Sequence, residues 1–285
     1  MTATLATITY VYAVTTSEPD SGQGHTPPSG GIDGASVRAL PVGPLTAVVS
    51  SLPRDHFSEA ALKDSLNDLG RLEAVARGHH TVVSDMAAHR PVLPLRLATI
   101  YDDDERVRQM VRGRAREFLS ALDRFAGRAE WGVKVFTDDT PAPADEGDRA
   151  APAPSRPTTP GGGGAGRAYL RRRIQRREAR ERAWERASDL STRLVDRLDQ
   201  LAEARRRHRA QDNQLSGARG GNVLNAAFLV SEENTRAFAA EVERWSRAEP
   251  GVRVELTGPW VPYSFVPDGL DERTSPDPSP STVER

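Results

Sequence analysis

The chain has 285 residues, more than one domain usually contains, so two compact domains joined by a linker are expected. Its 39 basic residues (lysine and arginine) nearly balance its 40 acidic ones, so the chain as a whole has no electrostatic reason to bind nucleic acid. The absence of cysteine excludes disulfides and thiolate metal sites and fits a reducing cytoplasm, and no apolar run has the length of a signal peptide or a membrane segment.

The first part of the chain, residues 1–136, alternates strand and helix patterns. Ile8–Val14 places apolar side chains in strand alternation, which predicts a strand covered on one face. Residues 17–36 are rich in Gly, Pro, Ser and Asp and predict a mobile loop. Val37–Pro41 and Leu45–Ser50 flank a Gly-Pro turn, which is typical of a β-hairpin.

Two helices and two strands follow in this part. Apolar residues recur at helical spacing from the N-cap Ser58 to about Ala88, with Gly78 as a candidate kink. Val92–Ile100 favours a buried strand in which Arg96 would be costly. A second helix follows the acids at 102–105, and the strand Trp131–Phe136 is expected to end the domain. This order predicts an α+β fold of modified ferredoxin-like type with an extra strand.

A second α+β domain is expected at 167–267. The segment 137–166 is a Pro, Ala and Gly tract with too few apolar residues to fold, which indicates a disordered linker. A long helix is expected from Arg167 to about Asp212, because one narrow apolar stripe runs along it. Residues 268–285 are almost free of apolar residues and predict a disordered tail. The remaining expected elements are a strand Val223–Val230, a helix Glu232–Ala248 and a strand Val252–Thr257.

No residue pattern supports a catalytic, cofactor or metal site, so none is predicted. The run Asp102–Glu105 offers carboxylates for a cation, but its spacing is not that of an EF-hand. Acids in a first helical turn instead complement the helix dipole and cap exposed backbone amides, and this role is predicted here. His79, His80 and His89 lie close in sequence, yet neither a cysteine nor the H-E-x-x-H pattern completes a zinc set. There is also no G-x-S-x-G nucleophile motif.

The long helix opens with a cluster of arginines that could contact phosphates or an anionic membrane. Glu178, Glu181 and Glu185 fall three or four residues from these arginines. The spacing therefore favours a solvated face linked by ion pairs, and no nucleic-acid partner is predicted.

The segment Gly258–Phe265, GPWVPYSF, combines three aromatics and two prolines directly after a strand. A helix cannot form there, because proline removes a backbone donor and fixes its own φ. A proline-stiffened aromatic segment loses little entropy on docking, so it serves either as a plug of the domain's own core or as a partner-binding surface.

This segment resembles the most specific motif of the GvpF/GvpL family of gas vesicle accessory proteins, in which paired prolines follow the tryptophan. Val261 replaces the first of those prolines here, while Trp260, Pro262, Tyr263 and Phe265 are retained. Further similar stretches are ITYVYAVT, LPVGPLTAVVS, VLPLRLATIY, WGVKVF, GRAYLRRR and NAAFLV, in the same order along the chain.

The resemblance implies a two-domain α+β protein that works without catalysis or cofactor in the cytoplasm and at the gas vesicle. Its implied partners are the hydrophobic major shell protein and other gas vesicle accessory proteins. The hypothesis is that it binds shell subunits and assists nucleation or growth of the vesicle, through a sheet edge or through Trp260, Pro262, Tyr263 and Phe265. The resemblance does not separate the F subtype from the L subtype.

Two other functions stay open on the sequence. One is a small-molecule enzyme with a pocket between the domains, using Arg96, His79 and the nearby acids on an anionic substrate. The other is a regulator that binds nucleic acid through the arginine-rich helix, which predicts salt-sensitive retention of DNA.

Overall fold

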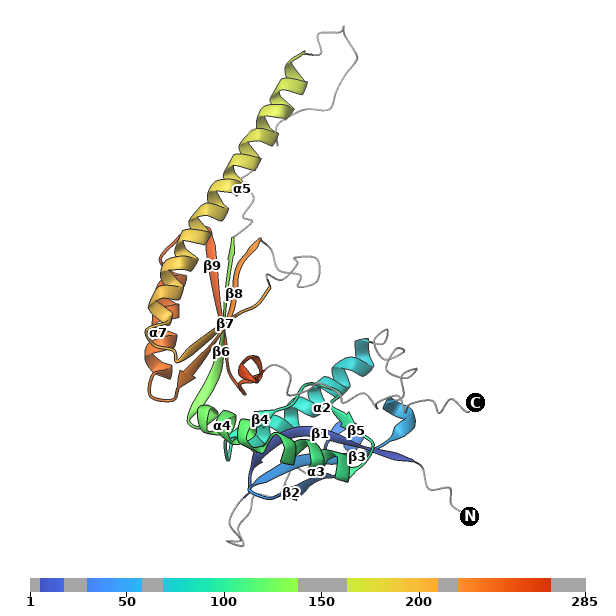
Figure 1. The fold of residues 1–285 in the computed structure, drawn as a ribbon. Helices are drawn as coiled ribbons and strands as arrows, with labels where there is room; N and C mark the ends of the chain where they lie inside the picture. Colours follow the sequence, from blue (N-terminus) through green and yellow to red (C-terminus); the bar gives the residue numbers. More distant parts are fainter. Residues whose placement is uncertain (1–5, 18–29, 58–68, 138–162, 210–219, 268–285) are drawn as a thin grey trace, which may run out of the picture. The chain divides into compact units, whose positions relative to one another are not determined.

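The computed structural model describes residues 6–17, 30–57, 69–137, 163–209 and 220–267, with side chains from Tyr169 onward in the fourth range. The chain divides into two units, Met1–Glu130 with Pro259–Arg285, and Trp131–Gly258 (Figure 1). The expected linker, apart from its two ends, the tail and most of the expected loop lie outside the described residues. Both units combine antiparallel strands with helices, which confirms the α+β class.

The first unit contains β1 (Thr7–Thr16), β2 (Val37–Val42), β3 (Leu45–Pro53), α2 (Leu69–Ala87), β4 (Val92–Pro94), β5 (Ile100–Tyr101), α3 (Asp104–Gly113) and α4 (Ala115–Phe125), with 3₁₀ helices at Ile32–Gly34, Arg54–Phe57 and Tyr263–Phe265. The second sheet and its helices contain β6 (Arg128–Thr137), α5 (Gly163–Leu198), β7 (Ala204–Arg207), β8 (Asn222–Ser231), α7 (Thr235–Ser246) and β9 (Val252–Trp260).

The first sheet has the strand order β2-β3-β1-β4, and β5 also pairs with β1. The predicted hairpin is confirmed, because β2 and β3 pair antiparallel up to Val42 opposite Leu45. Gly43 in its turn has a φ of 61°, a left-handed conformation that glycine adopts without a steric penalty. A register shift between Val11 and Ala13 marks a bulge in β1 opposite β3.

Helices cover both faces of this sheet. The Tyr10 hydroxyl contacts His79 of α2, with 2.9 Å between its oxygen and Nδ1, whereas the Thr9 hydroxyl donates to Asp104 of α3 at 2.9 Å. Neighbouring residues of a strand point to opposite faces, so α2 and α3 lie on different sides of β1. This arrangement is how the unit departs from a plain ferredoxin-like sandwich, in which the helices share one face.

The expected strand at 92–100 is two short strands, β4 and β5, which both pair with β1. Between them Ala98 has a φ of 62°, so the chain turns out of the sheet before it returns at Ile100. Arg96 lies in this turn and is exposed. The expected cost of burying Arg96 therefore does not arise.

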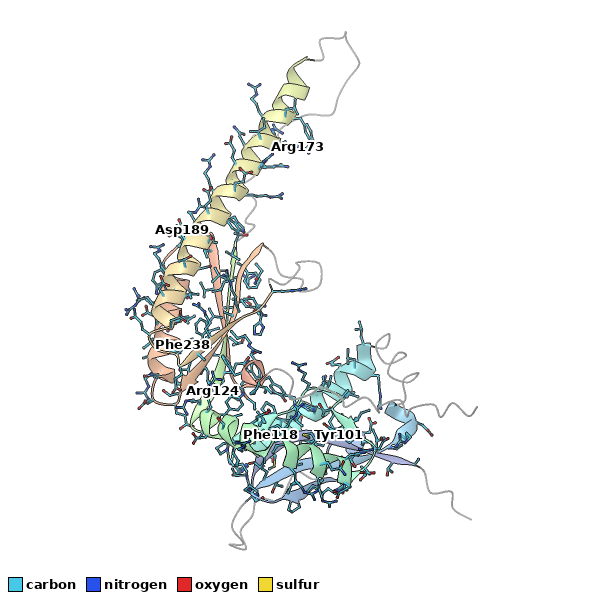
Figure 2. All side chains as sticks on the ribbon, in the orientation of Figure 1. Tyr101, Phe118, Arg124, Arg173, Asp189 and Phe238 are labelled. Carbon is cyan, nitrogen blue, oxygen red and sulfur yellow. The ribbon has the colours of Figure 1, made fainter. Side chains whose placement is uncertain are left out.

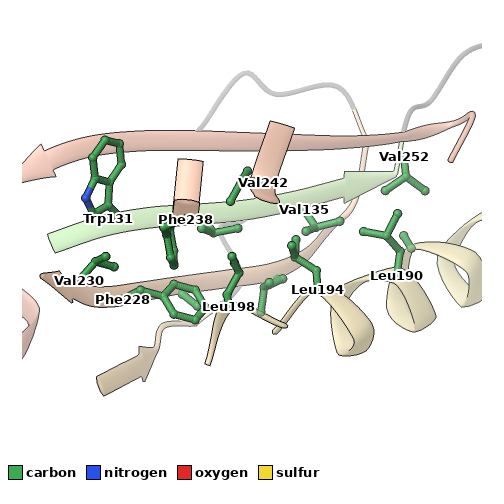
Figure 3. Packing of buried hydrophobic residues seen from close by; sticks show 14 residues of the cluster. Trp131, Val135, Leu190, Leu194, Leu198, Phe228, Val230, Phe238, Val242 and Val252 are labelled. Carbon is green, nitrogen blue, oxygen red and sulfur yellow. The ribbon is translucent and has the colours of Figure 1, made fainter. Parts of the chain in front are cut away.

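The second sheet has the order β7-β8-β6-β9, so β6 is a central strand. The strand at 131–136 was expected to end the first domain, but it belongs to this second sheet instead. Its alternate residues Trp131, Val133 and Val135 pack into one core with Phe228 of β8 and Phe238 of α7. Figure 3 shows Val135 facing the leucines of α5 in this core.

The long helix α5 is buried along one stripe of its C-terminal half only. That stripe consists of Ala187, Leu190, Leu194 and Leu198. From Tyr169 to Arg182 every residue is exposed, and the helix extends beyond the strands of its own unit (Figure 1).

The helix ends at Leu198, although the sequence predicted that it would continue to about Asp212. The chain instead forms β7, which pairs with β8 and places Arg206 opposite Ala227. Three of the four residues of β7 are arginines, so the strand carries no apolar alternation in its sequence and pairs with β8 through its backbone. In the described part of the chain, no helix has the length and apolarity needed to cross a membrane.

Candidate functional site

The C-terminal aromatic segment follows β9 and packs into the first unit. Val261 and Phe265 are 8% and 6% exposed, and Pro262 is buried as well. Val261 belongs to the core cluster that contains Tyr10 and Val82, and Tyr263 packs against the same cluster. These residues therefore close a core, as one of the two sequence interpretations proposed. That core is the first unit's, however, and not the core of the C-terminal domain in which the sequence placed the segment.

Glu130 fixes this segment through two hydrogen bonds. The backbone N–H of Ser264 donates to Oε2 at 2.8 Å, and the Ser264 hydroxyl donates to Oε1 at 2.6 Å. Glu130 is only 9% exposed, so these donors replace the water that its carboxylate loses on burial. The sequence did not single out Glu130, although an acid directly before the apolar alternation of a strand is a signal of a buried partner.

A cluster of rings lies beneath the segment. His79 is buried between Tyr10, Tyr12 and Tyr263, with ring centroids 5.7 to 6.2 Å from its own. The Tyr10 hydroxyl accepts a hydrogen bond from the N–H of Ala98 at 3.0 Å and shares a second hydrogen bond, 2.9 Å long, with Nδ1 of His79.

Burial holds this cluster in its neutral form. It lowers the pKa of His79 to about 4, and it raises the pKa of the Tyr10 and Tyr263 phenols above their ordinary value. His79 is 3% exposed, so its ring does not face a substrate from solvent. The enzyme hypothesis built on His79 and the exposed Arg96 gains nothing from this placement.

Trp260 is the one member of the predicted partner-binding set with a largely exposed side chain, at 46%. Its ring meets the His80 ring of α2 edge-on, with 5.8 Å between the centroids. Pro262 and Phe265 are buried directly after it, and Tyr263 is half-buried. The structure thus presents one exposed indole on a base that is anchored on its C-terminal side.

The acidic run at 102–105 has structural partners. Asp103 caps α3, because its Oδ1 accepts from the N–H of Arg106 at 2.9 Å. The two carboxylate oxygens of Asp104 accept hydrogen bonds from Nη1 and Nη2 of Arg38. These bonds hold the pKa of the Asp104 carboxyl below its usual value. The predicted capping role is confirmed. Among the described residues, no group of three His, Asp or Glu side chains is arranged to hold a metal ion.

The arginines of α5 form the ion pairs that the sequence predicted. Arg177 pairs with Glu181 at 2.7 Å, and Arg182 pairs with Glu178 at 2.9 Å. All four side chains are at least half exposed, so solvent screens each pair and its contribution to stability is small. Most of the remaining arginines on this helix face solvent.

Comparison with known proteins gives a consistent result. Residues 8–267 match the family model of the gas vesicle synthesis protein GvpL/GvpF. Gas vesicle protein L of Streptomyces sp. (strain CB03234) is 44% identical over 90% of this chain and 91% of its own, whereas gas vesicle protein F of the same strain is 25% identical over 81% of this chain and 87% of its own. The crystal structure of the gas vesicle protein GvpF from Anabaena sp. PCC7120 has the same fold, with a TM-score of 0.60, 18% identity and coverage of 92% and 96% of the two chains.

Proposed function

Because the chain belongs to the GvpL/GvpF family of gas vesicle synthesis proteins, and so has a role in gas vesicle formation, we propose that it binds the hydrophobic shell subunit. In this role it prevents the subunits from aggregating through their apolar surfaces. It acts at the growing gas vesicle, where it assists nucleation or growth. Other gas vesicle accessory proteins are further partners. An exposed apolar surface of the kind a shell subunit carries requires such a partner before assembly.

The exposed indole of Trp260 supports this proposal more than any other feature. An exposed tryptophan is the residue type that most often dominates binding energy at protein interfaces. The residues that follow it are fixed in the core by Val261 and Phe265 and by the hydrogen bonds of Glu130 to Ser264. Little conformational entropy is then lost when Trp260 docks, which favours affinity.

The four residues of the aromatic segment take different roles in this proposal. Trp260 makes the contact with the shell subunit, while Pro262, Tyr263 and Phe265 hold it in position from the core side. The higher identity to an L protein than to an F protein of one strain also supports an L-type role for this chain.

Coexpression with the shell subunit tests the proposal. The tagged chain is expected to capture the subunit and to raise its soluble fraction. Trp260→Ala should reduce capture by roughly tenfold or more, the loss typical of an interface tryptophan, with unchanged folding. Leu97→Ala is the matched control, because Leu97 is an exposed apolar residue of the same unit, and it should capture normally.

Two results would count against the proposal in different ways. Normal capture by the Trp260 variant would move the contact elsewhere, first to the edge strand β2 of the first sheet. A wild-type chain that captures no shell subunit at low or high salt would overturn the binding function itself.

A further inference from the structure

The N-terminal half of α5, residues 169–186, is a basic helical arm that its own unit leaves uncovered. Leu170, Ile174 and Trp184 are 56%, 55% and 54% exposed, an unusual placement for large apolar side chains on one helix. In Figure 2 the side chains of this arm, Arg173 among them, project from the helix beyond the strands of its unit. A partner helix that packs along the arm would bury these three side chains.

The large exposed apolar side chains of the arm, apart from Tyr169, fall on one seam of the helix. The positions 170, 174, 177, 181, 184, 188, 191 and 195 alternate steps of four and three residues, the spacing that keeps one face of a helix toward another helix. Leu170, Ile174 and Trp184 occupy this seam, and Arg177 and Glu181 form an ion pair in its middle. Toward the sheet the seam reaches the small residues Ser188, which is half-buried, and Ser191, which is buried.

A groove of about 300 Å³ opens where the seam meets the sheet. One wall comes from α5, with Trp184, Ser188 and Val195, and the other from β7 and β8, with Arg207 and Val223. Small residues at a helix surface allow the backbone of a second helix to approach closely. The seam therefore continues into a hollow of mixed polar and apolar lining, in which Arg205 and Arg207 of β7 face Asp196 of α5 among the lining residues.

Charge determines which helix fits this seam. Residues 169–186 contain eight arginines and three glutamates, a net charge of +5, while the rest of the chain carries −6. Two arms of this kind would repel each other, so a second copy of the same helix is disfavoured. A polyanion alone would use the arginines but leave Leu170, Ile174 and Trp184 without a partner.

We propose that the α5 arm and its groove bind an acidic amphipathic helix of a partner protein. Apolar side chains of that helix cover Leu170, Ile174 and Trp184, and its flanking carboxylates meet arginines such as Arg173 and Arg180. The end of the helix lies in the groove beside Ser188. This surface is separate from the indole of Trp260 and does not depend on the proposed contact with the shell subunit.

Fluorescence anisotropy with two designed peptides tests the proposal on the full-length chain. One peptide is a helix of about three heptads with leucine at a and d and glutamate at e and g; the matched peptide carries lysine in place of glutamate. The glutamate peptide should bind at least about tenfold more tightly than the lysine peptide. Equal binding of the two would overturn the proposal.

Substitutions in the seam provide a second, independent test. The variant L170A/I174A/W184A should bind the glutamate peptide about tenfold or more weakly than the wild-type chain does. Its helix content should stay unchanged, because alanine is a good helix former. Trp260→Ala should leave this binding intact, so the proposal and the shell-binding function can fail separately. An unaltered affinity of the triple variant for the glutamate peptide would show that the seam does not bind it and would overturn the proposal.

Two competing occupants are measured in the same series. A duplex DNA oligonucleotide should bind weakly, lose its binding with salt and respond little to the triple variant. DNA that displaces the glutamate peptide at 150 mM salt would assign the arm to nucleic acid and overturn the proposal. Sedimentation velocity should show a monomer, whereas a dimer that disappears in the triple variant would assign the seam to a second copy.

Discussion

Glu130 and Ser264 are joined by two short hydrogen bonds although 134 positions separate them in the sequence. The carboxylate is nearly buried and accepts both the backbone N–H and the hydroxyl of Ser264. This pair connects the beginning of β6 to the segment that closes the core of the first unit.

Removal of the Glu130 carboxylate should loosen the C-terminal segment. Glu130→Ala leaves the N–H and hydroxyl of Ser264 without their acceptor, which costs about 1 to 3 kcal/mol of unfolding free energy. Hydrogen exchange of residues 261–266 should accelerate together with this loss. Glu117→Ala removes an exposed acid of the same unit and should leave both quantities unchanged. Normal exchange in the Glu130 variant would contradict the role of this pair.

The buried His79 predicts a specific pH dependence of stability. Its pKa is about 4 in the folded chain against 6.5 in the unfolded chain, so between these values the unfolded chain binds a proton that the folded chain does not. The free energy of unfolding should therefore fall as the pH falls from 6.5 to 4, by about 3 kcal/mol from this residue. Above pH 6.5 the histidine contributes no slope.

Urea unfolding at a series of pH values measures this slope. His79→Gln should remove it, while His80→Gln should retain it, because His80 is an exposed neighbour on the same helix. If both variants keep the wild-type slope between pH 6.5 and 4, another group is responsible.

Gly78 is a close-contact position and does not break α2. A Cβ placed there would lie 3.3 Å from the Cα of Ile32, which is itself buried. Gly78→Leu should therefore push the two segments apart and cost about 1 to 3 kcal/mol. Gly113→Ala, at a helical glycine with open space around it, should be neutral or stabilise by up to about 1 kcal/mol. Thermal unfolding measures the stability of both variants, and equal changes in stability would contradict the close contact at Gly78.

The two halves of α5 should respond differently to truncation. Leu194 is fully buried in the second core, so Leu194→Ala should cost about 2 to 5 kcal/mol. Ile174→Ala on the exposed arm should change the unfolding free energy by less than about 0.5 kcal/mol. A large destabilisation by the Ile174 change would mean that the arm is packed within the chain.

Local signals in the sequence predicted much of this fold. The β2–β3 hairpin, the cap at Asp103 and the buried stripe around Leu194 each depend on residues within a few positions of one another. The aromatic segment was also recognised, with both of its interpretations. Val261 and Phe265 are buried in a core, as the plug interpretation expects, whereas Trp260 is exposed on the surface.

The features that the sequence did not predict depend on distant partners. β6 has the alternation of an ordinary strand, and nothing near Trp131 indicates which of two sheets it joins. β7 consists almost entirely of arginine, so only the backbone of β8 reveals it as a strand. Glu130 and Ser264 both belong to the first unit but are separated in sequence by the whole second unit, and no periodicity can detect such a pair.

The placement of Val261 and Phe265 also determines when the first unit can finish folding during synthesis. Its other core residues, such as Ile8, Tyr10 and Val82, leave the ribosome early, but Val261 follows only after the whole second unit has been made. Until then the nascent chain exposes the apolar site beneath α2. The first unit is thus the first to begin folding and the last to complete it, and a fragment that ends before residue 261 lacks the side chains that close this core.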